Sequence, residues 1–176
     1  MKRLFLLRHA KSDRSSDLDD FDRHLNARGR RAAPKIAEIM HQRGFLPDVV
    51  LSSPSRRTRE TWELIAPELG FDRDKARLVD QLYLAPAKQI LDLLRQLPAE
   101  VGSAMVIGHN PGLEDIAARL ASEEQSTQGQ SALAELGRKY PTCALTVLDF
   151  PIANWAHLQL GAGAIVAFIT PASLAA

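Results

Sequence analysis

Short apolar, β-rich runs alternate with helical patterns along this chain of 176 residues. The apolar runs predict strands at residues 2–7, 48–51, 76–82, 104–108, 144–150 and 164–170. Several of them contain continuous apolar runs, which are typical of strands covered on both faces. Helical spacing of apolar residues falls between the strands, at about 27–43, 54–69, 86–97 and 111–122. This alternation predicts a three-layer α/β/α sandwich around one mostly parallel mixed sheet of about six strands.

The length fits one domain, which we expect to span residues 1–176. With 45% hydrophobic and 24% charged residues, the composition is that of a globular protein and excludes wholesale disorder. The single cysteine, Cys143, excludes an intrachain disulfide and a cysteine-based zinc site. No apolar run approaches the roughly 18 residues of a membrane span, and the apolar start lacks a signal-peptide cleavage site. We therefore expect a cytoplasmic protein.

The net charge of +1 hides an uneven distribution of charge. Residues 1–60 hold 14 Lys and Arg against 8 Asp and Glu, whereas the rest of the chain is acidic. This basic first third suggests an anionic ligand, and the alternative for Arg28, Arg30 and Arg31 is a solvated helix face. We expect no nucleic acid as a partner, because the basic residues are not interleaved with aromatic ones. We expect no membrane partner either, because no apolar run is long enough to span one.

Polar side chains follow three of the predicted strands directly. Arg8 and His9 come after the first strand, and His109 comes after the strand at 104–108. The strand at 48–51 is followed by Ser-Ser-Pro-Ser-Arg-Arg at residues 52–57. Because ligands bind at the carboxyl ends of strands in α/β sheets, we expect these segments to converge on one pocket.

Two of the predicted helices are expected to begin at these strand ends. Ser53 is a suitable N-cap with Pro54 as the first helical residue, and Asn110 and Pro111 repeat the pattern. A first turn of this kind offers free backbone N–H groups to an anion, and Arg56 or Arg57 would add a positive charge. The plain alternative is a capped helix with solvated arginines.

A pocket built from these residues suits a tetrahedral phosphate dianion. Guanidinium forks and imidazole donors match the phosphate oxygens. A neutral histidine can accept a phosphoryl group, because its reference pKa is about 6.5. His9 would have to present one bare nitrogen, whereas a bound dianion would raise the pKa of His109. No metal is required, and a metal site made from these two histidines would lack a carboxylate at a ligand-like spacing.

Three motifs, in this order, resemble those of the histidine phosphatase (phosphoglycerate mutase-like) superfamily. Leu-Leu-Arg-His-Ala-Lys-Ser at 6–12 resembles its Arg-His-Gly signature, with Ala10 in place of the usual glycine. The segment 53–61 resembles its motif Ser-Pro-x-x-Arg-x-x-x-Thr, and Gly-His-Asn-Pro-Gly at 108–112 resembles its second-histidine motif. The segment 20–29 also resembles the bacterial phosphohistidine phosphatases of the SixA type, a branch with short chains and no long inserted cap.

The resemblance implies a role for each matched residue. It makes His9 the nucleophile that becomes phosphorylated. Arg8, Arg57 and His109 would form the rest of the phosphate pocket. The spacing of the second motif assigns the catalytic arginine to Arg57 rather than to Arg56.

Three further positions have weaker assignments. Ser12 lies where the family often has a serine, which makes it a candidate contributor to phosphate binding. The superfamily usually has an acidic proton donor after its third strand, and Asp80 is the only acid nearby. The alternative for Asp80 is a solvated strand residue. His24 replaces a proline that this branch commonly shows, and it lies either in a solvated loop or at the pocket rim.

The sequence predicts a metal-independent phosphatase that uses no cofactor and hydrolyses phosphohistidine on a protein through a phospho-His9 intermediate. The expected partner is a phosphohistidine-bearing protein such as a phosphotransfer domain. Phosphohistidine can be protonated on its own ring nitrogen, so its leaving group needs no secure donor, unlike an alkoxide. Two alternatives stay open: a broader phosphomonoesterase acting on a small phosphorylated metabolite, and a non-catalytic module that binds a phosphoprotein.

Overall fold

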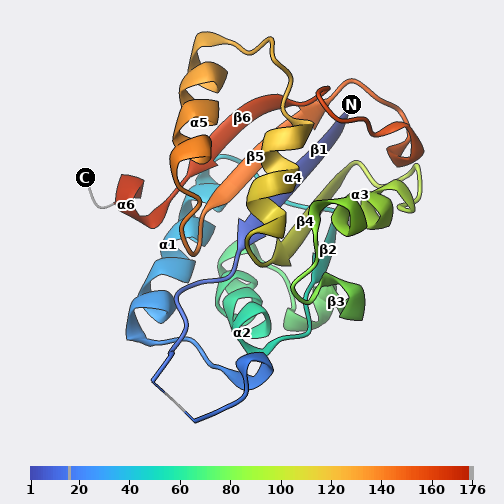
Figure 1. Ribbon diagram of the computed structural model, residues 1–176. Coiled ribbons are helices and arrows are strands. Elements are labelled where there is room, and N and C mark those ends of the chain that lie inside the picture. Colours follow the sequence, from blue (N-terminus) through green and yellow to red (C-terminus); the bar gives the residue numbers. More distant parts are fainter. Residues whose placement is uncertain (16, 175–176) are drawn as a thin grey trace.

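The computed structural model describes residues 1–15 and 17–174 as one mixed sheet between two layers of helices (Figure 1). The six strands have the spatial order β3-β2-β4-β1-β5-β6. Their bounds are β1 (Lys2–Arg8), β2 (Val49–Ser52), β3 (Ala76–Leu78), β4 (Ser103–Gly108), β5 (Leu145–Phe150) and β6 (Ala164–Ile169). Strands β1 to β4 pair in parallel, whereas β5 is antiparallel to both β1 and β6. The predicted mostly parallel mixed sheet is confirmed.

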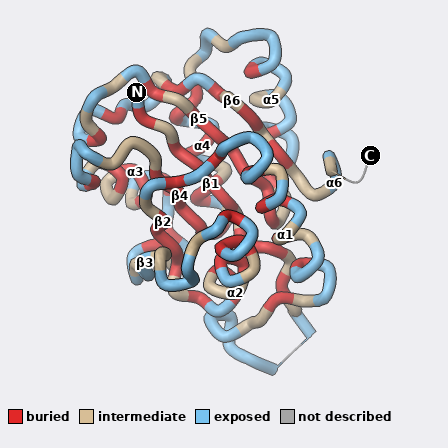
Figure 2. The backbone as a smooth tube through the Cα atoms, turned by 180° about the vertical axis from the view of Figure 1, so that it is seen from behind, coloured by how far each residue is buried: buried red, intermediate tan, exposed pale blue. Residues whose placement is uncertain are grey.

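Helices cover both faces of the sheet. One face packs against α1 (Ala27–Gln42) and α2 (Arg56–Ile65), and the other against α3 (Ala87–Arg95), α4 (Gly112–Leu120) and α5 (Thr127–Arg138). Successive residues of β1 alternate between the two cores: Leu4 and Leu6 belong to one, Phe5 and Leu7 to the other. Figure 2 shows β1 as a largely buried segment of the tube. The three-layer sandwich is confirmed, and it explains why residues 4–7 of β1 are all apolar.

Three predicted boundaries were wrong at the carboxyl edge of the sheet. The strand expected at 76–82 ends at Leu78, because its neighbour β2 ends at Ser52, which pairs with Leu78. A short 3-10 helix, Asp80–Leu82, follows. Helix α2 begins at Arg56 rather than at Pro54, and its N-cap is Ser55. Helix α4 likewise begins at Gly112, one residue later than expected.

The C-terminal third also differs in its boundaries. The polar stretch at 123–139 predicts only a short helix around residues 131–136, but the structure has the longer α5 there, whose N-cap Ser126 accepts a hydrogen bond from the Gly129 N–H. The sequence at 171–176 predicts a loosely held tail. Of these residues the structure describes α6 (Pro171–Leu174), and residues 175–176 lie outside the described residues. Within the described part of the chain, every helix is too short or too polar to cross a bilayer.

Two glycines let helices approach neighbouring backbone closely at this edge. Gly29, in the first turn of α1, lies against the backbone of Lys11. Gly112, at the start of α4, lies against the carbonyl of Ala85. A Cβ atom on either glycine would overlap these backbone atoms. The lack of a side chain at Gly29 therefore lets the loop after β1 pack directly against α1. The lack of a side chain at Gly112 lets the segment before α3 pack directly against α4.

We expect Gly112→Ala to lower the free energy of unfolding by about 2 kcal/mol, because the new methyl group meets a backbone carbonyl rather than a flexible side chain. Gly137→Ala in α5 is the matched control, since a Cβ there meets nothing within 4 Å. It should raise the free energy of unfolding by roughly 0.5–1 kcal/mol through helix propensity. Urea denaturation measures both, and equal stability of the two variants would contradict the close approach.

Candidate active site

The carboxyl ends of three neighbouring strands bring together the polar residues that were expected to converge. Strands β2, β4 and β1 lie side by side, and Ser53, His109 and His9 directly follow them. The Ser53 N–H donates to the Ile107 carbonyl at 3.0 Å, and the His9 N–H donates to the Gly108 carbonyl at 3.2 Å. The two imidazole rings lie 5.4 Å apart between centroids. Sheet pairing thus sets the relative positions of the two histidines.

His9 is buried and held in one tautomer. Its Nδ1 lies 2.8 Å from the Ala10 carbonyl, which can only accept, so Nδ1 carries the hydrogen and Nε2 keeps its lone pair. Burial outweighs this hydrogen bond and, with His109, Arg57 and Arg8 nearby, holds the pKa of His9 well below 6.5. The ring is therefore neutral with one bare nitrogen, the form that a nucleophile requires.

Thr61, the last residue of the second motif, fixes the loop that follows His9. Its hydroxyl accepts a hydrogen bond from the Ala10 N–H at 2.9 Å and donates to the Arg57 carbonyl at 2.7 Å. Ala10 itself is fully buried in the apolar cluster beneath α1. The methyl group that replaces the usual glycine is therefore accommodated by core packing.

Arg8 and Arg57 each leave one buried donor without a partner. The Nε atom of both side chains is buried and makes no hydrogen bond to any described residue. Another nitrogen of each side chain is engaged: Nη1 of Arg8 donates to the Tyr140 carbonyl at 2.9 Å, and Nη1 of Arg57 donates to the Asp20 carbonyl at 2.7 Å. An unsatisfied buried donor is costly, more so on a charged group. Two such guanidinium donors fit an oxyanion ligand.

His109 is a neutral ring held between Arg57 and Ser53. Nη2 of Arg57 donates to Nδ1 of His109 at 3.2 Å, so Nε2 carries the hydrogen and donates to the Ser53 hydroxyl at 2.8 Å. Burial first, and then the charge of Arg57, lower the pKa of His109 to about 3. A phosphate dianion beside the ring acts in the opposite direction. The charged His109 expected from the sequence therefore belongs to a phosphate-bound state.

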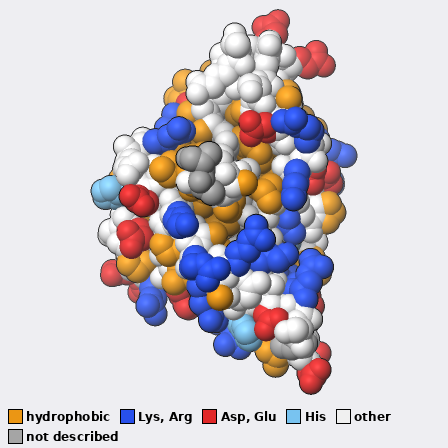
Figure 3. Space-filling model, turned by 90° about the vertical axis from the view of Figure 1, so that its left-hand side faces the viewer, with side chains coloured by type: hydrophobic (Ala, Val, Ile, Leu, Met, Phe, Trp, Pro, Cys, Tyr) orange, Lys and Arg blue, Asp and Glu red, His pale blue; other side chains and the backbone are white. Residues whose placement is uncertain are grey.

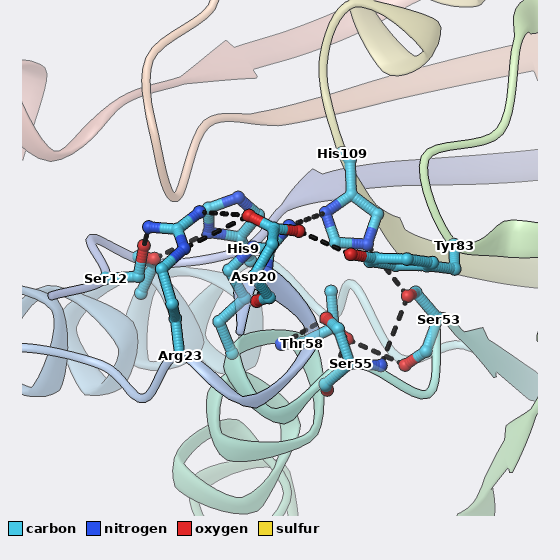
Figure 4. A network of polar contacts seen from close by, with 11 residues as sticks. His9, Ser12, Asp20, Arg23, Ser53, Ser55, Thr58, Tyr83 and His109 are labelled. Atoms are coloured by element: carbon cyan, nitrogen blue, oxygen red, sulfur yellow. Dashed lines mark hydrogen bonds and ion pairs between the residues drawn. The ribbon is translucent and has the colours of Figure 1, made fainter. Parts of the chain in front are cut away.

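Asp20 joins the site from the loop between β1 and α1, and sequence reasoning did not single it out. Its carboxylate accepts hydrogen bonds from Arg57 at 3.1 Å, from Arg23 at 3.0 Å and from the Tyr83 hydroxyl (Figure 4). Burial alone would raise its pKa, but these three contacts outweigh it and lower the pKa of Asp20 to about 2. The only sequence signal was its place in the segment 20–29. The Arg57 fork thus already holds an anion.

Arg23 and Tyr83 complete the rim of the pocket. Nη1 of Arg23 donates to the buried Ser12 hydroxyl at 2.7 Å, so Ser12 is connected to Asp20 through this arginine. The Tyr83 ring packs edge-on against His109, with 5.5 Å between centroids. Tyr83 was missed because it comes after the 3-10 helix that replaces the end of the predicted third strand.

The structure does not bring Asp80 or His24 into this network. Asp80 is exposed, and its side chain makes no hydrogen bond or ion pair with residues 1–15 or 17–174. Its role as proton donor is untested, and its exposure favours the alternative of a solvated residue. His24 contacts the Leu25 carbonyl through Nδ1 at 2.9 Å, and its Nε2 lies 4.0 Å from the Asp13 carboxylate. Over the same described ranges, no group of three or more His, Cys, Asp and Glu residues is arranged to hold a metal ion.

Known proteins share both sequence and fold with this chain. A family model described as "Histidine phosphatase superfamily (branch 1)" matches residues 4–82. An uncharacterized protein of Mycobacterium tuberculosis is 31% identical over 166 residues, which cover 94% of this chain and 99% of that protein.

Two solved structures extend the likeness to nearly the whole fold. The crystal structure of a candidate phosphohistidine phosphatase SixA from Agrobacterium tumefaciens has a TM-score of 0.79 at 31% identity, and covers 97% of this chain and 98% of that one. The protein histidine phosphatase SixA, solved with tungstate, has the same fold, with a TM-score of 0.77 at 21% identity over 98% of this chain and 99% of that one.

The lowered pKa of His109 predicts that the free energy of unfolding falls as the pH falls. Its pKa is about 3 in the folded chain, against a usual value of 6.5, so between these pH values only the unfolded chain binds the proton. This histidine should reduce stability by up to about 1.4 kcal/mol per pH unit as the pH decreases through that range. Urea denaturation from about pH 7.5 to about pH 5 should give a shallower slope for His109→Gln than for wild type. Parallel slopes would argue against a buried neutral ring.

Proposed function

This chain belongs to the histidine phosphatase superfamily, in its SixA-type branch, and is a phosphatase; we propose that its substrate is phosphohistidine on a protein. The proposed reaction passes through a covalent phospho-His9 intermediate and needs no metal ion or cofactor. One observation supports this most directly: the buried Nε donors of Arg8 and Arg57 have no partner among the described residues, and both charges act on the neutral His9.

In the first step, Nε2 of His9 attacks phosphorus as the bond from phosphorus to the substrate nitrogen breaks. The electron pair of that bond leaves with the substrate ring, which departs as neutral imidazole because its other nitrogen carries a hydrogen. In the second step, water attacks the phosphoryl group, His9 regains its lone pair, and phosphate leaves with both hydrogens of the water. The hydrogen bond from Nδ1 to Ala10 keeps the same tautomer through both steps.

The phosphoryl group would be stabilised by charge and position. Its transition state is loose and spreads negative charge over three oxygens. The guanidinium groups of Arg8 and Arg57 supply fixed donors toward that charge. His109, once the bound dianion has raised its pKa, would add a third cationic donor. Each of these side chains is held by the strand ends or by the first turn of α2.

The contact of Asp20 with Arg57 favours a second candidate function. This candidate is a phosphomonoesterase that acts on a small phosphorylated metabolite. A phosphate dianion on Arg57 would share the guanidinium with the Asp20 carboxylate, and two adjacent anions favour protonation of one of them. A protonated Asp20 could donate to an alkoxide leaving group, which phosphohistidine does not need. Leaving-group dependence therefore separates the two candidates.

We expect His9→Ala to reduce turnover by more than about 1,000-fold, because removal of a nucleophile eliminates the covalent route. Wild-type enzyme incubated with a phosphohistidine protein labelled on phosphorus should acquire a label that is labile in acid and stable in alkali. Excess EDTA should change neither result. His24→Ala is the matched control, since His24 makes no contact with the network among the described residues, and it should behave as wild type. Substantial turnover by His9→Ala would overturn the assignment, and so would loss of activity on chelation.

The two candidate acids should differ when leaving groups are compared. Asp20→Asn is expected to lower kcat/KM for a sugar phosphate by about tenfold or more relative to a phosphohistidine protein, because only the alkoxide needs a donor. Asp80→Asn should leave both values unchanged, since Asp80 is exposed and outside the network. A selective loss in Asp80→Asn would return the donor role to that residue. Wild-type kcat/KM values that are comparable for the two substrates would favour the metabolite phosphatase.

A further inference from the structure

A groove next to the site combines a basic rim with an apolar floor. It has a volume of about 370 Å³ and lies between α1, α5, the loop before β5 and the end of β6. Figure 3 shows Lys and Arg side chains gathered around apolar surface on this face of the molecule. The basic rim consists of Lys11, Arg28, Arg138 and Lys139, and the floor includes Pro141 and Phe168.

The positive charges of this rim are not compensated within the described chain. None of the four cations forms an ion pair with residues 1–15 or 17–174. Among the described residues that line the groove, Glu135 is the only acidic one. Like charges gathered around one hollow repel each other and create a positive potential, which attracts an anionic partner.

The groove adjoins the loop that follows β1 and carries His9. Lys11 comes two residues after His9, and the loop that carries Lys139 contacts the site through its backbone. The Tyr140 carbonyl accepts a hydrogen bond from Arg8 at 2.9 Å, and the Cys143 N–H donates to the His9 carbonyl at 2.9 Å. A macromolecule that places one side chain on His9 would therefore lay its neighbouring surface over the groove.

We propose that this groove docks an acidic segment of the phosphoprotein substrate. Asp and Glu side chains of the segment would meet the basic rim, and its aliphatic side chains would pack on Pro141 and Phe168. The apolar floor favours a protein segment over a small anion, which would have no use for it. The inference rests on the proposed function and goes beyond it, because it assigns recognition to residues outside the phosphate pocket.

Charge reversal on the rim tests the proposal. Arg28→Glu combined with Lys139→Glu should lower kcat/KM for a phosphohistidine-bearing phosphotransfer domain by at least about tenfold, mainly through KM, and leave kcat/KM for free phosphohistidine unchanged. Added salt should weaken the reaction of wild type with the protein substrate more than that of the variant. Arg30→Glu combined with Arg31→Glu is the matched control: it makes the same charge change on two exposed residues of α1 that do not line the groove.

Each other outcome counts against the docking site. Wild-type enzyme that is inactive on both substrates would overturn the proposed function, and the docking site with it. Activity on both substrates that charge reversal leaves unchanged would overturn the docking site alone. An equal loss on both substrates would mean that the rim shapes the phosphate pocket. A change from dimer to monomer in sedimentation velocity on charge reversal would mean that the groove pairs two copies of this chain.

Discussion

The site depends on a guanidinium group that is buried at the edge of the sheet. Arg57 is 2% exposed, and a buried charge must be compensated by anions or hydrogen bonds. Its contacts with Asp20 draw the loop between β1 and α1 over the strand ends, and its hydrogen bond to His109 selects the tautomer of that ring. The same charge helps to keep His9 neutral. One side chain therefore couples the loop conformation to the protonation of both histidines.

Most of the fold followed from apolar periodicity in the sequence. Strands buried on both faces and helices with one apolar face were predictable, because each pattern reports burial of the residue itself. The end of β3 was not, since it depends on where the neighbouring strand stops pairing. The predicted N-cap of α2, Ser53, was also wrong. Ser53 looked like a capping residue, but its hydroxyl accepts a hydrogen bond from His109, and Ser55 caps the helix instead.

The candidate site was only partly predictable for a related reason. His9 and His109 directly follow strands, so the pairing of β1 with β4 brings them together. Asp20 and Tyr83 reach the same place from loops, through contacts that span 37 and 63 residues of sequence. A loop conformation set by one long-range ion pair leaves no periodic signal in the sequence. Asp80 shows that residue type and nearness to a strand end are not sufficient. It is an acid that follows β3 closely, but it lies exposed to solvent.

The contact between Asp20 and Arg57 has a consequence for the release of phosphate at the end of each proposed catalytic cycle. A carboxylate attached to the same chain has a high effective concentration at its site. Inorganic phosphate would share the guanidinium with this carboxylate, and the repulsion between the two anions would lower the net affinity for that product. The incoming substrate faces the same repulsion, but it has additional surface with which to bind. In the proposed phosphatase, a tethered carboxylate would thus favour product release and would limit inhibition by the phosphate already present in the medium.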